Sequence, residues 1–294
     1  PLRGDDDPKN GSVCIVTPWE NTMDCAAWPR LGWFDSLQHW WDTFSTTGNL
    51  PESVESPGTD VHKWGDTCSL GLRATIEAGA SVKLPVWVTW SFPTFEKYWG
   101  SCEGECSKPT WQNYYAKDFP TARRAAEYLQ DELPRLYRET TAYRDCLYSS
   151  TLPDEVLDAV SSQISILRSP TCLRLPDGTF YGFEGCNCES GCCVGSCTHV
   201  WNYTQALPFL FPSLQRSMRE AYYEYGFSNT GSGAIHFRLD VPMEHPDPDE
   251  EPSIAKPAAD GQLGGIIQVY RDWKVTGDTD WLKGIWPSVV KSLE

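Results

Sequence analysis

The stretch DGQLGGIIQVYRDWKVTGDTDWLKGIWPSVVKSLE, residues 260–294, decides the fold class of this chain. It indicates two helices joined by a tight turn. Gly277 supplies the stop that a helix C-terminus prefers, and Asp278 or Thr279 supplies the N-cap of the helix that follows. We therefore predict an antiparallel helical hairpin in this part of the chain.

The helical pattern extends back to residue 118. Apolar side chains recur every three or four positions in 118–148 and again in 152–169, and a third helical region, 199–227, is interrupted by prolines. Successive helix pairs with a site at their loops are typical of an (α/α) barrel. Because the helices are too few to close such a barrel, we expect the chain to be an internal fragment.

Residues 1–117 show strand-like signals instead. CIVT, residues 14–17, is a short β-branched run, and residues 70–92 alternate apolar and polar side chains on both sides of a turn that contains Gly, which predicts a β-hairpin. The intervening residues are rich in Gly, Pro and Trp, as in a β-sandwich with many loops. The expected fold is therefore α+β and multidomain, with a partial β-sandwich in 1–117 and the first helices of a barrel in 118–294.

Composition restricts the partners. The net charge is −16, which argues against nucleic acid, because phosphate binding needs a basic surface. Many of the 14 tryptophans stand beside polar residues, as in walls that stack on sugar rings, although bulky core residues are the simpler explanation for any one of them. No apolar run reaches the ~18 residues of a membrane span, and no signal peptide opens the chain. Localisation stays open, with the cytoplasm favoured.

One stretch concentrates the chemistry: FYGFEGCNCESGCCVGSCTHVWNY, residues 180–203, places Glu184 ahead of five of the 12 cysteines. The cysteine spacing and the nearby His199 are compatible with a zinc site, but the sequence has no distant second pair of ligands of the kind that a zinc finger or ribbon requires. Disulfides and free thiols both remain open. CVGSCT is similar to the motif of papain-type proteases, but too few residues follow it to supply their histidine.

Glu184 offers a different chemistry. It follows the strand-like TFYGF and precedes a loop that leads to THVWNY. A carboxylate held at the end of a strand and backed by aromatic side chains is what glycosidic chemistry needs, because one carboxylate attacks the oxocarbenium-like centre while a second acid protonates the leaving oxygen. A surface acid remains the alternative from the pattern alone.

Several blocks in consistent order resemble glycoside hydrolase family 116, the bile-acid β-glucosidase or non-lysosomal glucosylceramidase family. The blocks are PVWVTWSFPTF at 85–95, the segments 147–185 and 197–227, and DGQLGGIIQVYRDWKVTGDTDWLKGIWP at 260–287. The resemblance implies an N-terminal β-sandwich, a catalytic (α/α)6 barrel, and retaining hydrolysis of a β-glucoside, glucosylceramide or a related sugar. It implies no metal and no organic cofactor.

The resemblance also assigns residues. The family's nucleophile is a Glu between an aromatic residue and Gly, which here is Glu184. Its acid/base Asp belongs to a later part of the barrel and has no counterpart in this chain, so we expect the chain alone to be inactive. Thr198 or His199 stands where relatives place a sugar-binding Asp. Asp260 matches an acid at the start of a barrel helix and is expected to contact substrate or to act as an N-cap.

Two alternative functions remain open. One is a noncatalytic carbohydrate-binding relative that retains an aromatic-walled cleft. The other is an interaction domain stabilised by zinc and centred on residues 186–199. The partner is thus predicted to be a carbohydrate or glycolipid, with the oligomeric state left open.

Overall fold

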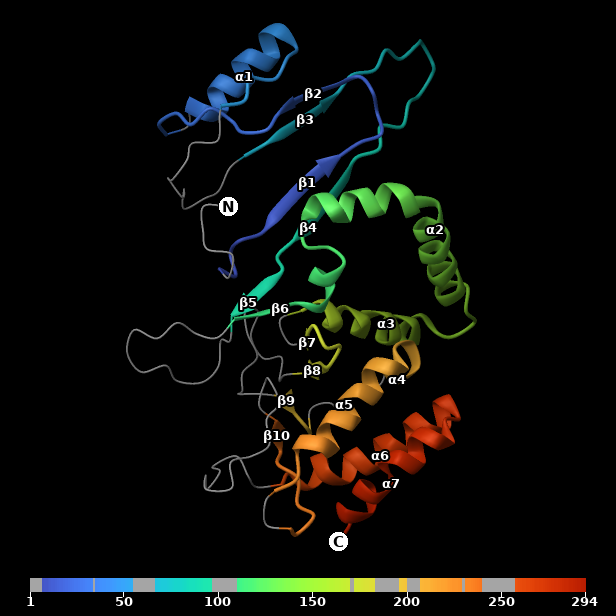
Figure 1. The fold of residues 1–294 in the computed structure, drawn as a ribbon. Coiled ribbons are helices and arrows are strands. Elements are labelled where there is room, and N and C mark those ends of the chain that lie inside the picture. The colour runs from blue at the N-terminus through green and yellow to red at the C-terminus, as the bar shows by residue number, and fades with distance from the viewer. Residues whose placement is uncertain are drawn as a thin grey trace, which may run out of the picture. The chain divides into compact units, whose positions relative to one another are not determined.

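The computed structural model describes most of the chain and divides it into two compact units (Figure 1). The first unit comprises residues 1–94 and 118–133, and the second comprises residues 95–117 and 134–294. The residues described are 7–33, 35–54, 67–96, 110–169, 172–182, 196–199, 207–228, 231–239 and 257–294.

Two antiparallel strand pairs form the sheets of the first unit. Strand β1 (Ser12–Val16) pairs with β4 (Trp87–Ser91), and β2 (Thr22–Cys25) pairs with β3 (Ser69–Leu72). The pairs are nested, because the chain runs out along β1 and β2 and returns along β3 and β4. The predicted hairpin in 70–92 is therefore wrong. Its two arms exist as β3 and β4, but each pairs with an earlier strand, since strand partners are chosen across the fold and not by proximity in sequence.

The polar face of the β1–β4 pair holds the start of the long helix α2 (Ala122–Tyr148). Ala122 is fully buried, its N–H donates to Ser12 Oγ at 2.8 Å, and its carbonyl accepts from Thr89 Oγ1 at 2.7 Å. Strand hydroxyls thus satisfy backbone groups of the first helical turn, which has no partners of its own for its N–H groups. Pro134 lies inside α2, and the division between the two units falls just before it.

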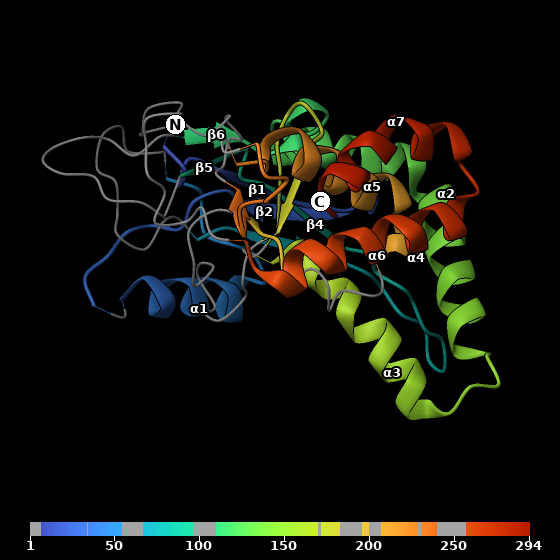
Figure 2. The ribbon, with the colours of Figure 1, turned by 90° about the horizontal axis from the view of Figure 1, so that it is seen from below.

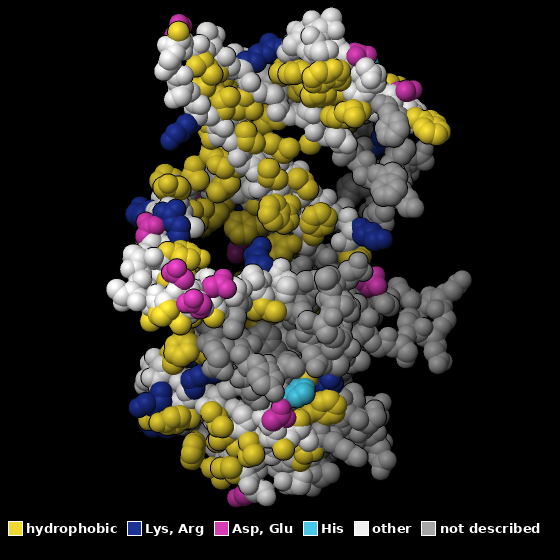
Figure 3. Space-filling view, turned by 180° about the vertical axis from the view of Figure 1, so that it is seen from behind, with side chains coloured by type: hydrophobic (Ala, Val, Ile, Leu, Met, Phe, Trp, Pro, Cys, Tyr) yellow, Lys and Arg dark blue, Asp and Glu magenta, His cyan; other side chains and the backbone are white. Residues whose placement is uncertain are grey.

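The opposite face of the β1–β4 pair is apolar and exposed. Val13 and Trp90 are directly opposite each other in the register and both are more than half exposed. Apolar side chains also reach the surface elsewhere on the face drawn in Figure 3. A two-stranded sheet is marginally stable by itself, so the contacts of its polar face with α2 matter for this unit.

Helix α1 (Asp35–Thr47) was not predicted, since residues 1–117 were expected to form strands and loops. It has no buried residues, but Leu37, Trp40, Trp41 and Phe44 recur at helical spacing and were the signal for it. An aromatic stack accounts for its position: Trp40 and Phe44, four residues apart, stack at 5.2 Å between ring centroids, and Trp28 stacks on Trp40 at 5.5 Å.

The second unit is mixed α and β. Its helices after α2 follow the predicted regions: α3 (Asp154–Ser162), a 3₁₀ continuation (Gln163–Arg168), α4 (Leu207–Leu210), α5 (Pro212–Tyr225), α6 (Ala259–Thr276) and α7 (Thr279–Lys291). The strands form short pairs: β5 (Thr94–Glu96) with β6 (Thr110–Gln112), β7 (Cys172–Arg174) with β8 (Phe180–Gly182), and β9 (Ser196–Cys197) with β10 (Arg238–Leu239).

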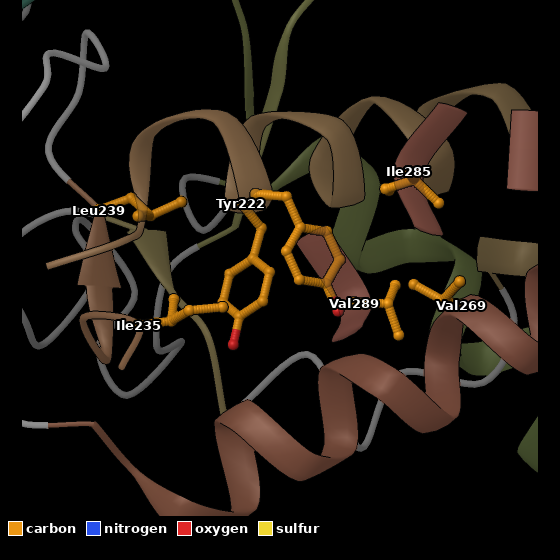
Figure 4. Packing of buried hydrophobic residues seen from close by; sticks show 7 residues of the cluster. Tyr222, Ile235, Leu239, Val269, Ile285 and Val289 are labelled. Carbon is orange, nitrogen blue, oxygen red and sulfur yellow. The ribbon is translucent and has the colours of Figure 1, made fainter. Parts of the chain in front are cut away.

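The largest core of this unit lies between α5, α6 and α7, which run side by side (Figures 1 and 2). Its buried side chains, seen in Figure 4, are Tyr222, Tyr223, Ile235, Leu239, Val269, Ile285 and Val289. Burying each aliphatic member contributes about 1.5–3 kcal/mol, so this cluster is a main source of stability for the three helices. No helix among the described residues is long and apolar enough to cross a bilayer.

The predicted hairpin at 260–294 is confirmed in its details. Gly277 ends α6 in the left-handed conformation, with φ of 69°. Asp278, and not Thr279, is the N-cap of α7: its Oδ1 accepts from the N–H of Trp281 at 3.0 Å, and its Oδ2 accepts from Arg216 Nη1 on α5 at 2.7 Å. The bond from Trp281 and then the one from Arg216 lower the pKa of the Asp278 carboxyl.

We expect Asp278→Ala to lower the midpoint of thermal unfolding at neutral pH, with Asp278→Asn in between, because Asn keeps the cap and loses the ion pair. A carboxyl with a lowered folded-state pKa stabilises the fold above its unfolded value, near 3.8, and this is lost as the pH falls through the folded value. The gap between wild type and Asp278→Asn should therefore close in acid. Circular dichroism melts at neutral pH and in acid measure these midpoints. Equal midpoints for Asp278→Ala and wild type at neutral pH would contradict the role of Asp278 as a cap.

Candidate functional site

The predicted nucleophile follows strand β8, which ends at Gly182. Glu184 lies outside the described residues, as do Cys186, Cys188, Cys192 and Cys193. The site can therefore be built only from the elements on either side of residues 183–195.

Those two sides are joined by the hydroxyl of Ser196. Ser196 Oγ donates to the carbonyl of Gly182 at 3.0 Å and accepts from its N–H at 3.3 Å, and all of these atoms are buried. Ser196 also pairs with Leu239 in the β9–β10 ladder. The last residue before this segment and the first residue after it are thus held together.

Two of the predicted substrate residues, Thr198 and His199, follow β9, and the third, Asp260 in the first turn of α6, lies beside His199. Thr198 is buried, and both its N–H and its Oγ1 donate to the carbonyl of Phe237, each at 2.9 Å. His199 Nδ1 lies 3.4 Å from Asp260 Oδ2, and their side chains are 31% and 55% exposed. The hydroxyl of Thr198 is therefore committed to the fold, whereas His199 and Asp260 can both reach a ligand.

Asp260 does not act as the N-cap of α6, as one interpretation of the sequence had it. The N-cap is Ala258, which makes no side-chain cap bond, and Asp260 lies in the first turn. A carboxylate there interacts favourably with the helix N-terminus through the free N–H groups and the macrodipole. The same position also brings Asp260 to His199.

Two glycines on one face of α6 make this proximity possible. A Cβ on Gly261 would lie 2.7 Å from Thr198 Oγ1, and one on Gly265 would lie 3.1 Å from the ring of Tyr222. Tyr222 OH also contacts the carbonyl of Gly261, at 3.4 Å. Because the two glycines are four residues apart, they form one smooth stripe against which the turn after β9 and helix α5 pack.

A buried polar cluster lies along the same helix pair. Gln215 Nε2 donates to Gln268 Oε1 at 3.0 Å, and Arg271 Nε donates to Asp272 Oδ1 at 3.1 Å. Arg219, only 2% exposed, lies with its guanidinium carbon 4.8 Å from the centroid of the Tyr222 ring. This cluster was not predicted from the sequence, although polar side chains four residues apart on both helices, at 215 and 219 and at 268 and 272, indicate it.

Burial sets the electrostatics of the cluster. Desolvation raises the pKa of the Asp272 carboxyl, with Arg271 acting in the opposite direction, and it lowers the pKa of the Arg219 guanidinium. The pKa values of the Tyr222 and Tyr223 hydroxyls are raised for the same reason. Both tyrosines therefore stay neutral at physiological pH and cannot offset the charge of Arg219.

A hollow of about 540 Å³ lies between the β7–β8 hairpin and α5. Its walls are mainly polar and include Arg174, Tyr181, Glu220 and Tyr225. Arg174 is stacked on Tyr114 at 3.7 Å, and Glu220 accepts from Trp281 Nε1 at 2.9 Å, so two of the charged walls are already engaged. Thr198, His199 and Asp260 do not line this hollow.

No group of three His, Cys, Asp or Glu side chains with the arrangement of a metal site occurs among the described residues. The cysteines of the zinc hypothesis are mostly outside them, so that hypothesis is not tested. Of the cysteines that the structure does describe, Cys14, Cys25, Cys68 and Cys146 are free thiols.

Comparison with known families defines the class of protein. Residues 2–138 match the family model described as beta-glucosidase 2, glycosyl-hydrolase family 116 N-term. The match covers just under half of the chain; it supports membership of glycoside hydrolase family 116 and confirms the resemblance found in the sequence. The match begins well before the first resembling block at 85–95 and ends within α2, so the predicted domain boundary at 117/118 stays a prediction. A search of curated proteins finds no match.

We expect Gly261→Ala to destabilise the chain by about 1–3 kcal/mol, because the new methyl must displace the buried, hydrogen-bonded Thr198 side chain. Gly284→Ala in α7 is the matched control. Nothing lies within 4 Å of its Cβ position, so helix propensity alone acts and stability should rise by about 1 kcal/mol. Urea unfolding of the two variants measures both changes, and an equal effect in both would disprove the close approach.

Proposed function

We propose that the chain is part of a retaining β-glycosidase that hydrolyses a β-glucoside, glucosylceramide or a related β-linked sugar, with Glu184 as the nucleophile. The family match to residues 2–138 carries this proposal, because the family is one of glycoside hydrolases. The proposed domain organisation is the predicted one, an N-terminal β-sandwich in 1–117 and the start of an (α/α)6 barrel in 118–294.

The arrangement around residues 183–195 supports the proposal. Gly182, two residues before Glu184, is bound by Ser196, and two residues later the chain reaches Thr198. Two residues of chain span at most about 7 Å. A nucleophile that follows β8 and sugar-binding groups that follow β9 would thus share one end of the β7–β10 region.

We assign distinct roles to the three nearby residues. Thr198 is best suited to a positioning role, because its hydroxyl proton is used by Phe237. His199 with Nδ1–H directed to Asp260 presents Nε2 as an acceptor for a sugar hydroxyl, and the second oxygen of Asp260 offers another acceptor. Two neighbouring acceptors can bind adjacent hydroxyls of a pyranose ring, which requires polar groups at fixed spacing.

The reaction would follow the retaining route. Glu184, ionised, attacks the anomeric carbon as the glycosidic bond breaks, and a second carboxylic acid protonates the departing oxygen. The second acid, now deprotonated, then removes a proton from water, and the water oxygen attacks the anomeric carbon and releases Glu184. The resemblance places that acid/base Asp in a part of the barrel without a counterpart here. We therefore expect residues 1–294 alone to be inactive.

The test is covalent trapping of the chain together with any flanking sequence that its gene supplies. Incubation with an activated 2-deoxy-2-fluoro-β-glucoside should leave one fluoroglucosyl group on the peptide that contains Glu184, as seen by peptide mass spectrometry. Glu184→Gln should remove the adduct and lower kcat by about 10³-fold or more. Glu189→Gln, in the same segment but outside the motif, is the matched control and should keep both.

The outcomes separate the candidate functions. An adduct on another carboxylate would refute Glu184 as the nucleophile. No adduct with either the glucosyl or the xylosyl reagent, in a folded protein that still binds sugar, would favour the noncatalytic carbohydrate-binding relative. A stoichiometric zinc in the purified protein would favour the zinc-stabilised domain.

A further inference from the structure

Two tryptophans at helix α1 expose more than half of their surface, and the proposed reaction uses neither of them. Trp33, in the turn just before α1, is 96% exposed, and Trp41 is 55% exposed. Leu37, four residues before Trp41 and therefore on the same side of the helix, is 56% exposed. Apolar side chains gather over α1 on the face drawn in Figure 3. We call these three side chains the α1 platform.

The local structure holds the platform in place. Trp33 has φ of 53°, in the left-handed region that a bulky residue seldom adopts. Such a conformation persists only where the surrounding structure fixes it. On the adjoining side of α1, Trp40 stacks on Trp28, and this contact anchors the helix with Trp41 on the solvent side.

Polar side chains on α1 suit the hydroxyls of a sugar. Gln38 Nε2 donates to Asp42 Oδ1 at 2.7 Å, and the two residues follow Leu37 and Trp41 in the sequence. This bond orients both groups, and an amide oxygen and a second carboxylate oxygen are hydrogen-bond acceptors. The face of an indole ring is electron-rich and stacks on the C–H groups of a pyranose ring, whose hydroxyls lie around its edge. Aromatic faces beside a few fixed polar groups can thus bind a carbohydrate.

Area and charge distinguish between the possible occupants. An aromatic side chain buries about 150–250 Å², so the α1 platform offers less than the ~800 Å² that each partner contributes to a stable protein interface. Helix α1 contains Asp35 and Asp42 but no Lys or Arg, and the net charge of the chain is −16, so an anionic bilayer is repelled. A neutral saccharide is compatible with both the area and the charge.

We propose that the α1 platform binds a neutral oligosaccharide, whose rings stack on the two indoles and whose hydroxyls bind to Gln38 and Asp42. The rise of a helix separates Leu37 from Trp41 by about 6 Å along its axis, roughly the length of one sugar unit. Because Trp33 lies a further four residues away, the ligand has several linked rings. The surface breaks no bond: it holds a glycan on the chain. It stands on α1 alone and does not depend on the proposed glycosidase activity.

The experiment measures the binding of cellohexaose to the chain by isothermal titration calorimetry, with Glu184→Gln as the parent so that no bond is cleaved. Trp33→Ala and Trp41→Ala should each raise the Kd by about tenfold or more, because each removes one stacked ring. Trp90→Ala is the matched control: this tryptophan of the same unit is 60% exposed but lies on β4, so the Kd should not change. Asp260→Ala, which alters the proposed active site, should also leave this Kd unchanged.

Footprinting makes the test independent of how the variants fold. Bound cellohexaose should lower the oxidation of Trp33 and Trp41 by hydroxyl radicals several-fold, with Trp90 unaffected, as located by peptide mass spectrometry. The proposal is overturned if neither tryptophan is protected, if folded Trp33→Ala and Trp41→Ala keep the parent Kd, or if Trp90→Ala weakens binding equally.

Two other occupants are outcomes of the same test. Self-association that requires Trp33, in a chain that does not bind cellohexaose, would assign the α1 platform to a second copy. Binding to phosphatidylcholine vesicles that requires Trp33, again without binding of cellohexaose, would assign it to a bilayer. Either result would overturn the proposal.

Discussion

The close approach of α6 to its neighbours is the constraint on which the site depends. Gly261 lets the first turn of α6 meet Thr198, and Gly265 lets the next turn meet Tyr222 and Arg219 of α5. Without these contacts Asp260 would not lie 3.4 Å from His199. The helix gives up intrinsic stability for this, because each glycine costs about 1 kcal/mol relative to alanine in a helix interior. The apolar core beyond, with Val269, Ile285 and Val289, holds the helices together in compensation (Figure 4).

That apolar core and the polar cluster occupy the same helix pair and have different effects. Aliphatic burial favours compactness without direction. The buried amides and charges of Gln215, Arg219, Gln268 and Asp272 have directional requirements, so they permit few registers between α5 and α6. A polar cluster under a turn that carries candidate substrate residues fixes that turn with respect to both helices.

The elements that were predicted correctly are those decided within a few residues. Gly277 and Asp278 end one helix and begin the next through their own backbone and side-chain geometry. The predictions that failed concern contacts between residues that are distant in sequence. Residues 70–92 have the pattern of a hairpin, but β3 and β4 pair with β2 and β1. Helix α1 has apolar residues at helical spacing, but it buries none of them, and its stack with Trp28 joins residues that are distant in sequence.

The sequence by itself determined the class of this protein, the helical second half, and three candidate residues at 198, 199 and 260. It could do so because motifs and helix caps depend on residues that are close together in the sequence. Only the tertiary structure decided that these three residues meet, that Thr198 gives its hydroxyl to Phe237, and that Asp260 faces His199 instead of capping its helix. It also decided that Arg219 is buried without acceptors on two nitrogens. The physical reason is that burial and partner choice depend on the packing of segments that are distant in sequence, which no local pattern specifies.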